Sequence, residues 1–398
     1  MIGVLRIRLI LTATLLAQLG IEPAGAVLLL VPEEQPTIAA ALAIASFADT
    51  ISIAPGTYYE HDLSWPPGVS ILGRVVSADA TVIDAQYRGR VLDGAALVQL
   101  NELGYLTLRN GDAAGYYGSG LKVIGDPVLH HLIIEECRNS YYGAGLFVAG
   151  GATITDCVLR NNRSTAADTY GGGAWLASTG YAHAPMVRGL EVCGNQASSG
   201  SGIYFNDFIG HLEGLYVHDN IGSGMVVYNG EVDGIGPTIE NSLFLNNTGS
   251  GLAFDAGIVL RNCTFVGNGP AGTWVGAIHC GSTWDHPMQP RITQCIVAFN
   301  HGSGISWWET LHGPIDCNNV FGNDYADYVN LPNLTGQDGN ISTDPLFCSR
   351  GGNPYGLHTD SPCAPENNDC GLLMGAFPVA CGSTGTEETS WSAVKALY

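Results

Sequence analysis

The residues with the greatest capacity for chemistry in this chain are aromatic and polar side chains that recur about one repeat apart. The expected ligand-binding set is Lys122, Phe147, Trp175, Tyr204, Asn206, Tyr228, Asp255 and Trp308. Aromatic rings stack on the C–H faces of sugars, while neighbouring polar groups bond the sugar hydroxyls. An exposed apolar strip also suits a protein partner. The set therefore predicts a surface that binds a polysaccharide or another surface partner.

Metal chemistry has less support in the sequence. His130, His131 and His183 have no cysteine or carboxylate at ligand spacing, and His279 is interpreted as a core or rim histidine. No C-x-x-C pair occurs, so we expect neither a zinc site nor a cofactor. Calcium is left open, and no catalytic residue is assigned.

The charge of the chain restricts its partners. The formal net charge of the 398 residues is −21. This excess of acidic groups excludes nucleic acid and an anionic membrane surface as partners. It also disfavours a carboxylate-rich substrate unless a cation bridges the two charges.

A glycine followed by an apolar residue recurs every 22 to 29 residues and defines the elements that must position these side chains. The steps are Gly120-Leu121, Gly145-Leu146, Gly173-Ala174, Gly202-Ile203, Gly224-Met225, Gly251-Leu252, Gly276-Ala277 and Gly304-Ile305. A repeat of this length cannot bury its own apolar face, so it must stack on its neighbours as a solenoid. Period-2 runs and the 54 glycines exclude helical repeats. No leucine-rich frame occurs, and a parallel β-helix remains.

An asparagine usually closes the second strand of each repeat. These residues are Asn110, Asn139, Asn162, Asn195, Asn220, Asn247, Asn268, Asn300 and Asn323. Asparagine tolerates the left-handed conformation that a sharp corner needs. Stacked corners are expected to align these amides in a ladder.

Alternation along the glycine-marked strand sorts the outward side chains. If the residue after each glycine points into the core, the next one points out. The first outward column then contains Phe147, Trp175 and Tyr204, with Ile278 further along. The second contains Asn206 and Asp255, with Cys280 between Asp255 and Trp308. Loops such as residues 165–170 and 281–289 are expected either to flank this strip as side walls or to cover it.

The two ends of the chain have different signals. Arg6, Arg8 and an apolar run before Ala26 predict a signal peptide over residues 1–26, so we expect secretion and no membrane span in the mature chain. Thr37 is a candidate N-cap for a helix over residues 38–45, with Ile38, Leu42 and Ala45 on one face. This helix is expected to cap the open end of the solenoid.

The eleven cysteines fall into two groups. Cys157, Cys263 and Cys295 share one place in the repeat, which indicates small buried residues in an internal stack. The disulfide candidates are Cys348, Cys363, Cys370 and Cys381. Two bridges are expected, and the spacing leaves all three pairings open.

The segments 36–42 and 51–60, with the closing segments 318–323, 344–347 and 360–363, resemble the right-handed parallel β-helix superfamily of pectate lyase-like proteins. They are most similar to a bacterial secreted group mostly without assigned activity. The resemblance implies an all-β, right-handed parallel β-helix solenoid with an N-terminal capping helix and a disulfide-supported C-terminal segment. The expected organisation is a signal peptide at 1–26, the β-helix with its cap at 27–345, a closing segment at 346–382, and a linker with a short tail at 383–398.

The resemblance also sets what an enzyme of this fold would show. The four motifs of polygalacturonase-like members are absent, and Asp285-His286 is only a weak echo of a lyase motif. The leading hypothesis is therefore a secreted or cell-surface protein that binds a polysaccharide or surface partner through the aromatic strip without catalysis. One alternative is a polysaccharide lyase or glycoside hydrolase with a divergent site near Lys122, Asn206 and Asp255. Another is a structural adhesin or envelope component.

Overall fold

The protein was analysed as a computed structural model that describes residues 25–164, 166–178, 184–206, 210–228, 236–255, 257–281, 290–308, 313–348 and 355–382. The predicted signal peptide, the tail from residue 383, His183 and Asp285-His286 lie outside these residues, except for the last two positions of the predicted signal. Among the residues described, no helix has the length and apolar character needed to cross a membrane.

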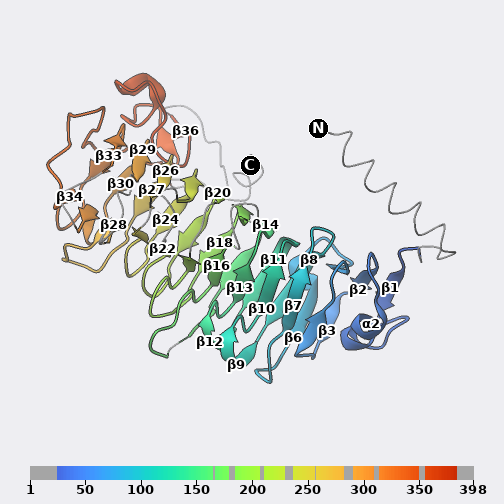
Figure 1. Ribbon diagram of the computed structural model, residues 1–398. Helices are drawn as coiled ribbons and strands as arrows, with labels where there is room; N and C mark the ends of the chain where they lie inside the picture. Colours follow the sequence, from blue (N-terminus) through green and yellow to red (C-terminus); the bar gives the residue numbers. More distant parts are fainter. Residues whose placement is uncertain are drawn as a thin grey trace, which may run out of the picture.

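The fold is a right-handed parallel β-helix in which consecutive coils stack along one axis (Figure 1). Sheet A has 21 strands: β1 (Leu28–Val31), β2 (Thr50–Ile53), β3 (Gly56–Tyr58), β5 (Ser70–Gly73), β6 (Thr81–Asp84), β8 (Glu102–Arg109), β11 (Val128–Glu135), β14 (Thr153–Thr155), β15 (Val158–Arg160), β17 (Met186–Arg188), β18 (Glu191–Cys193), β20 (His211–Glu213), β21 (Tyr216–His218), β23 (Thr238–Glu240), β24 (Leu243–Leu245), β26 (Val259–Arg261), β27 (Thr264–Val266), β29 (Arg291–Thr293), β30 (Ile296–Ala298), β32 (Ile315–Asp316) and β33 (Asn319–Phe321). Most coils give this sheet two short strands with a bend between them.

Sheet B contains the glycine-marked strands. Its 11 strands are β4 (Leu63–Trp65), β7 (Leu92–Leu97), β10 (Leu121–Gly125), β13 (Leu146–Ala149), β16 (Ala174–Ala177), β19 (Ile203–Asn206), β22 (Met225–Tyr228), β25 (Leu252–Phe254), β28 (Gly276–Cys280), β31 (Ser303–Trp307) and β34 (Tyr328–Val329). A small sheet C pairs β9 (Asp112–Tyr117) with β12 (Arg138–Tyr142), and β35 (Leu357–His358) pairs with β36 (Val379–Cys381).

The helix α2 (Ile38–Ile44) lies at the N-terminal end of the solenoid (Figure 1). Thr37 accepts a hydrogen bond from the backbone N–H of Ala40, as its predicted role as N-cap requires. Ile38, Ala41 and Leu42 are buried, and Ala45 is the C-cap. Two 3-10 helices, η1 (Ala78–Ala80) and η2 (Pro365–Asn367), complete the helical content of the described residues.

The core is a single apolar column between sheets A and B. The residue after each glycine mark is buried, as predicted, but the seventh repeat, at Gly276, has a different register. Leu252 lies opposite Ile278, so Ile278 and Cys280 point into the core and His279 points outward. The glycine mark misled the prediction there, because Gly276 pairs with Ser303 and not with Gly304, so Ala277 takes the place of the marked glycine within β28.

A ladder of buried side-chain amides closes one corner of the coils. Each Nδ2 group donates to the Oδ1 atom of the next asparagine at 2.8–3.2 Å, and the members are Asn162, Asn195, Asn220, Asn247, Asn268, Asn300 and Asn323. Asn110 was a predicted member but bonds Asp84 instead, and the side chain of Asn139, another predicted member, lies outside the described part of the chain. Cys137 takes the ladder position of its coil and donates its backbone N–H to Asn162. The left-handed residue of each corner precedes the ladder asparagine, as at Asn161, rather than being the ladder residue itself.

The C-terminal segment folds back over the outer face of sheet A. Two disulfides support this region, Cys317–Cys370 and Cys348–Cys381. The prediction that Cys363 forms a disulfide was wrong, because this thiol is free and buried and Cys317 is the partner of Cys370. Cys157, Cys263 and Cys295 are buried free thiols, as predicted.

Candidate functional site

The outward face of sheet B carries a row of three aromatic rings on adjacent strands. Phe147, Trp175 and Tyr204 are direct neighbours in β13, β16 and β19, in the register that alternation predicts. The rings of Phe147 and Trp175 are stacked with centroids 4.7 Å apart and planes 2° from parallel. The predicted aromatic row is therefore present, on one sheet and in successive coils.

A second row of aromatic rings, which the sequence analysis missed, lies beside the first. Tyr117, Tyr142 and Tyr170 stack with centroid distances of 5.8 and 5.7 Å. Each ring leans onto the aromatic residue one coil further along sheet B: Tyr117 on Phe147, Tyr142 on Trp175 and Tyr170 on Tyr204. The first row forms the floor of this surface, and the second row forms a wall beside it.

A glycine directly after each of these tyrosines makes the close approach of the two rows possible. Gly118, Gly143 and Gly171 have positive φ angles of 43°, 61° and 68°. A Cβ atom at Gly143 would lie 2.0 Å from the carbonyl oxygen of Leu146, so no other residue fits there. The motif Tyr-Gly-x-Gly is the sequence signal that could have identified the second row.

The two rows enclose a groove of about 600 Å³ on the surface, which we call the aromatic groove. Its lining residues are Tyr117, Tyr142, Tyr170, Trp175, Tyr204, Asn206 and Tyr228. None of these residues carries a charge at neutral pH. No hydrogen bond between described residues involves the hydroxyls of Tyr142, Tyr170 and Tyr228 or the indole N–H of Trp175. Tyr228 is exposed, and Tyr142, Tyr170 and Trp175 are half-buried.

Four of the eight predicted ligand-binding residues line the aromatic groove, namely Trp175, Tyr204, Asn206 and Tyr228. Phe147 is only 4% exposed, so it supports Trp175 from below and does not present a surface of its own. Tyr204 is 8% exposed beneath Tyr170. The segment before β16 therefore has both of the predicted effects. The Tyr170 ring covers Tyr204, and it also forms part of the side of the groove.

The remaining three predicted residues lie outside the groove. Lys122 is bonded through Nζ to the Asp93 carboxylate at 3.0 Å, and Arg90 bonds the same carboxylate at 2.5 Å. Asp255 is half-buried just after β25, one coil beyond Tyr228. Lys122 and Asp255 are five coils apart, or about 24 Å at about 4.8 Å per coil. They cannot act on the same bond of one substrate.

Trp308 is exposed but belongs to a separate aromatic pair. Its ring lies 5.6 Å from that of Trp274, three coils beyond Tyr228. Trp274 also contacts His279, whose Nδ1 atom lies 2.8 Å from the hydroxyl of Ser306. Burial lowers the pKa of His279. His279 is a rim residue with satisfied contacts, as the sequence analysis interpreted it.

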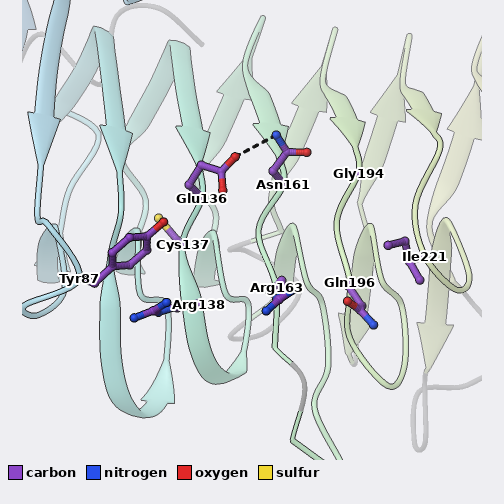
Figure 2. Close-up of a pocket in the computed structure, with 9 residues that line it drawn as sticks. All are labelled: Tyr87, Glu136, Cys137, Arg138, Asn161, Arg163, Gly194, Gln196 and Ile221. Carbon is purple, nitrogen blue, oxygen red and sulfur yellow. Dashed lines mark hydrogen bonds between the residues drawn. The ribbon is translucent and has the colours of Figure 1, made fainter.

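A second hollow of about 430 Å³ lies along a different corner of the coils (Figure 2). Arg138, Arg163, Gln196 and Ile221 follow one another there in successive coils. The Arg138 guanidinium lies 4.0 Å from the centre of the Tyr87 ring and donates to Asp112. This hollow has a mostly polar lining, and it shares no residue with the aromatic groove.

Comparison with known proteins agrees on the fold. Residues 97–278 match the family model described as right handed beta helix region. No curated protein matches the chain. Among solved structures, ORF18 of Geobacillus virus E2 is 12% identical, with a TM-score of 0.34, covering 74% of this chain and 52% of its own length.

Two further structures are similar at the same level. The mannuronan C-5 epimerase AlgE6 A-module of Azotobacter vinelandii is 13% identical with a TM-score of 0.39, and the match covers 77% of this chain and 93% of that one. The alginate lyase AlyGC of family PL6 is 12% identical with a TM-score of 0.35, and the match covers 90% of this chain and 60% of that one. Because these TM-scores are low, the function proposed below depends on the aromatic groove alone.

Proposed function

We propose that the protein binds a neutral polysaccharide in the aromatic groove and does not cleave it. The observation that carries the proposal is the groove itself, lined by six aromatic side chains and one amide. Sites for sugars combine ring faces, which pack on the C–H faces of the sugar, with a few donors and acceptors for its hydroxyls. The open hydroxyls of Tyr142, Tyr170 and Tyr228 supply the second element.

The charge of the site favours a neutral glycan over an acidic one. The described lining contains no cation, and Lys122, the lysine among the described residues, is already paired with Asp93. The net charge of −21 repels a polyuronate as well. A neutral polysaccharide needs no cation in the site, and the net charge of the protein does not repel it.

The length of the groove favours a polymer over a single sugar. Its lining residues come from five successive coils, from the coil of β10 to that of β22. Four steps of about 4.8 Å give a length of about 19 Å. A ligand that contacts both Tyr117 and Tyr228 must therefore extend over several sugar rings.

The described lining has none of the carboxylate pairs that glycoside hydrolysis commonly uses. We therefore propose a binding role at the cell surface or outside the cell. The two disulfides support an oxidising compartment.

The test is a binding panel of soluble oligosaccharides, measured by isothermal titration calorimetry. The panel pairs neutral gluco-, manno- and xylo-oligosaccharides with oligogalacturonate and oligoalginate of matched length. We expect a neutral member to bind and the acidic members not to bind. Preferential binding of the acidic members would contradict the proposal, and so would the release of new reducing or unsaturated ends during incubation.

A further inference from the structure

A second cluster of reactive side chains lies on sheet A, away from the aromatic groove. Cys193 in β18 and His218 in β21 are direct neighbours in adjacent coils, and Glu191 precedes Cys193 by two residues. Val192 and Val217 point into the core, so these three side chains point outward. One ligand atom from each residue lies within 4.8 Å of the other two. We propose that Glu191, Cys193 and His218 form a binding site for zinc.

The histidine is oriented as a metal ligand. Its Nδ1 atom lies 2.7 Å from a carboxylate oxygen of Asp219, which turns Nε2 toward Glu191 and Cys193. Nε2 is buried, lies 3.5 Å from Glu191 and has no hydrogen-bond partner. Histidine ligands of zinc typically donate their other ring N–H to a carboxylate in this way. A cation at the centre of the cluster would bind Nε2, which makes no hydrogen bond and meets Glu191 only at an ion-pair distance.

The surroundings shield the cluster without closing it. The Tyr216 ring stacks on the His218 ring at 4.0 Å. On the other side, Leu245 is the register neighbour of His218 and lies under Phe377 of the C-terminal segment. The side chains of His218 and Glu191 remain 14% and 26% exposed. A small ion therefore has a route in, and the apolar neighbours strengthen its attraction to the ligands.

The donor set selects the metal. A thiolate, an imidazole and a carboxylate are the ligands that zinc takes in proteins, whereas calcium and magnesium prefer oxygen alone. Three protein ligands leave the fourth tetrahedral position for water. The thiolate and two carboxylates of Cys193, Glu191 and Asp219 also supply the negative charge that offsets a divalent cation.

The free thiols of the chain provide a specific readout. Of the seven free cysteines, six are buried and Cys193 is partly exposed. A thiol reagent such as DTNB should therefore modify Cys193 alone in the folded, metal-free protein. Bound zinc should protect this thiol, because a coordinated sulfur is a poorer nucleophile.

The experiment uses the full chain, freed of metal with EDTA and dialysed at about pH 7.5. One equivalent of Zn²⁺ should slow the DTNB reaction at least about tenfold. One equivalent of Co²⁺ should give the near-ultraviolet absorption of a thiolate-to-cobalt charge transfer, and Cys193→Ser should remove it.

The matched variants are His218→Ala and His211→Ala. His211 lies on the same sheet in β20, and its charged neighbour is Glu213. Protection should be lost in His218→Ala and kept in His211→Ala, with His218→Gln as a substitute if the alanine variant does not fold. Unchanged DTNB kinetics with Zn²⁺ in the wild-type protein, or no cobalt–thiolate absorption, would overturn the proposal. Neither result bears on the aromatic groove, which lies on another sheet.

Discussion

Replacing Trp175 by alanine should weaken the binding of a neutral oligosaccharide more than any other single change in the aromatic groove. Trp175 lies between Phe147, on which it stacks, and Tyr142, whose ring meets it edge to face. Its indole N–H has no partner among the described residues. The substitution removes both a stacking surface and a donor at the centre of the groove.

The magnitude follows from these two losses. An aromatic stacking contact contributes about 0.5–1.5 kcal/mol, and a hydrogen bond to a neutral group contributes about as much. Together they amount to about 1–3 kcal/mol, or a dissociation constant raised about 5- to 150-fold. Trp175→Phe keeps the stacking contact and should lose only the binding free energy of the N–H hydrogen bond. Its affinity should therefore fall between those of the wild type and the alanine variant.

The assay is isothermal titration calorimetry with the neutral oligosaccharide that binds the wild type best. Because Trp175 also packs on Phe147, the melting temperature of each variant must show that it is folded. Tyr228→Ala is a second groove variant with little folding cost, since this ring is 43% exposed. Trp308→Ala is the matched control: it removes an exposed tryptophan from the same sheet, outside the groove. Equal affinity in the wild type, Trp175→Ala and Tyr228→Ala, or a loss confined to Trp308→Ala, would refute the reasoning.

Three further predictions concern the scaffold and the charge of the site. Asn220→Ala removes the acceptor of the buried Asn195 N–H and should lower the free energy of unfolding by about 2–4 kcal/mol, as measured by guanidinium denaturation. In the same assay, Asn161→Gly at an exposed left-handed corner should change the free energy of unfolding by less than about 0.5 kcal/mol. Gly143→Ala should lower both the melting temperature and sugar affinity, while Gly115→Ala, where a Cβ meets no atom within 4 Å, should leave both near the wild-type values. Binding should vary less than about twofold between about pH 5 and pH 8, because no aspartate, glutamate or histidine is among the described lining residues, and a steeper titration curve would show that an ionisable group contacts the ligand.

The fold could be predicted because one short signal recurs in eight successive coils. A glycine followed by an inward apolar residue sets the register of sheet B, and alternation then gives the outward face. The same signal failed at Gly276, since this glycine pairs with Ser303 and lies one position earlier in its strand than the other marked glycines. A sequence mark fixes the register only where the marked residue keeps the same position relative to its neighbours in the sheet.

Four of the seven lining residues of the aromatic groove could be predicted for the same reason. Trp175 and Tyr204 follow the glycine mark on one sheet, whereas Tyr142 and Tyr170 come from the neighbouring segment of the coil. They reach the groove only because the left-handed Gly143 and Gly171 turn the chain sharply. A turn of this kind depends on φ angles that spacing alone does not reveal.

The cysteine chemistry was harder to predict because it depends on long-range folding. Cys317 follows an isoleucine and an aspartate, much like the buried Cys157, yet it is itself the left-handed corner residue, and Asn318 takes the inward place. Its partner Cys370 arrives 53 residues later, when the C-terminal segment folds back. Likewise, Cys193 and His218 are a full coil apart in sequence and become neighbours only through the parallel register.

The most direct test of the central claim is a crystal structure of the protein with the neutral oligosaccharide that binds best in the panel. The account predicts sugar rings along the aromatic groove, with one ring against Trp175 and sugar hydroxyls bonded to Tyr142, Tyr170 or Tyr228. An oligosaccharide bound instead along Arg138 and Arg163, or anywhere else on the molecule with the aromatic groove empty, would contradict it.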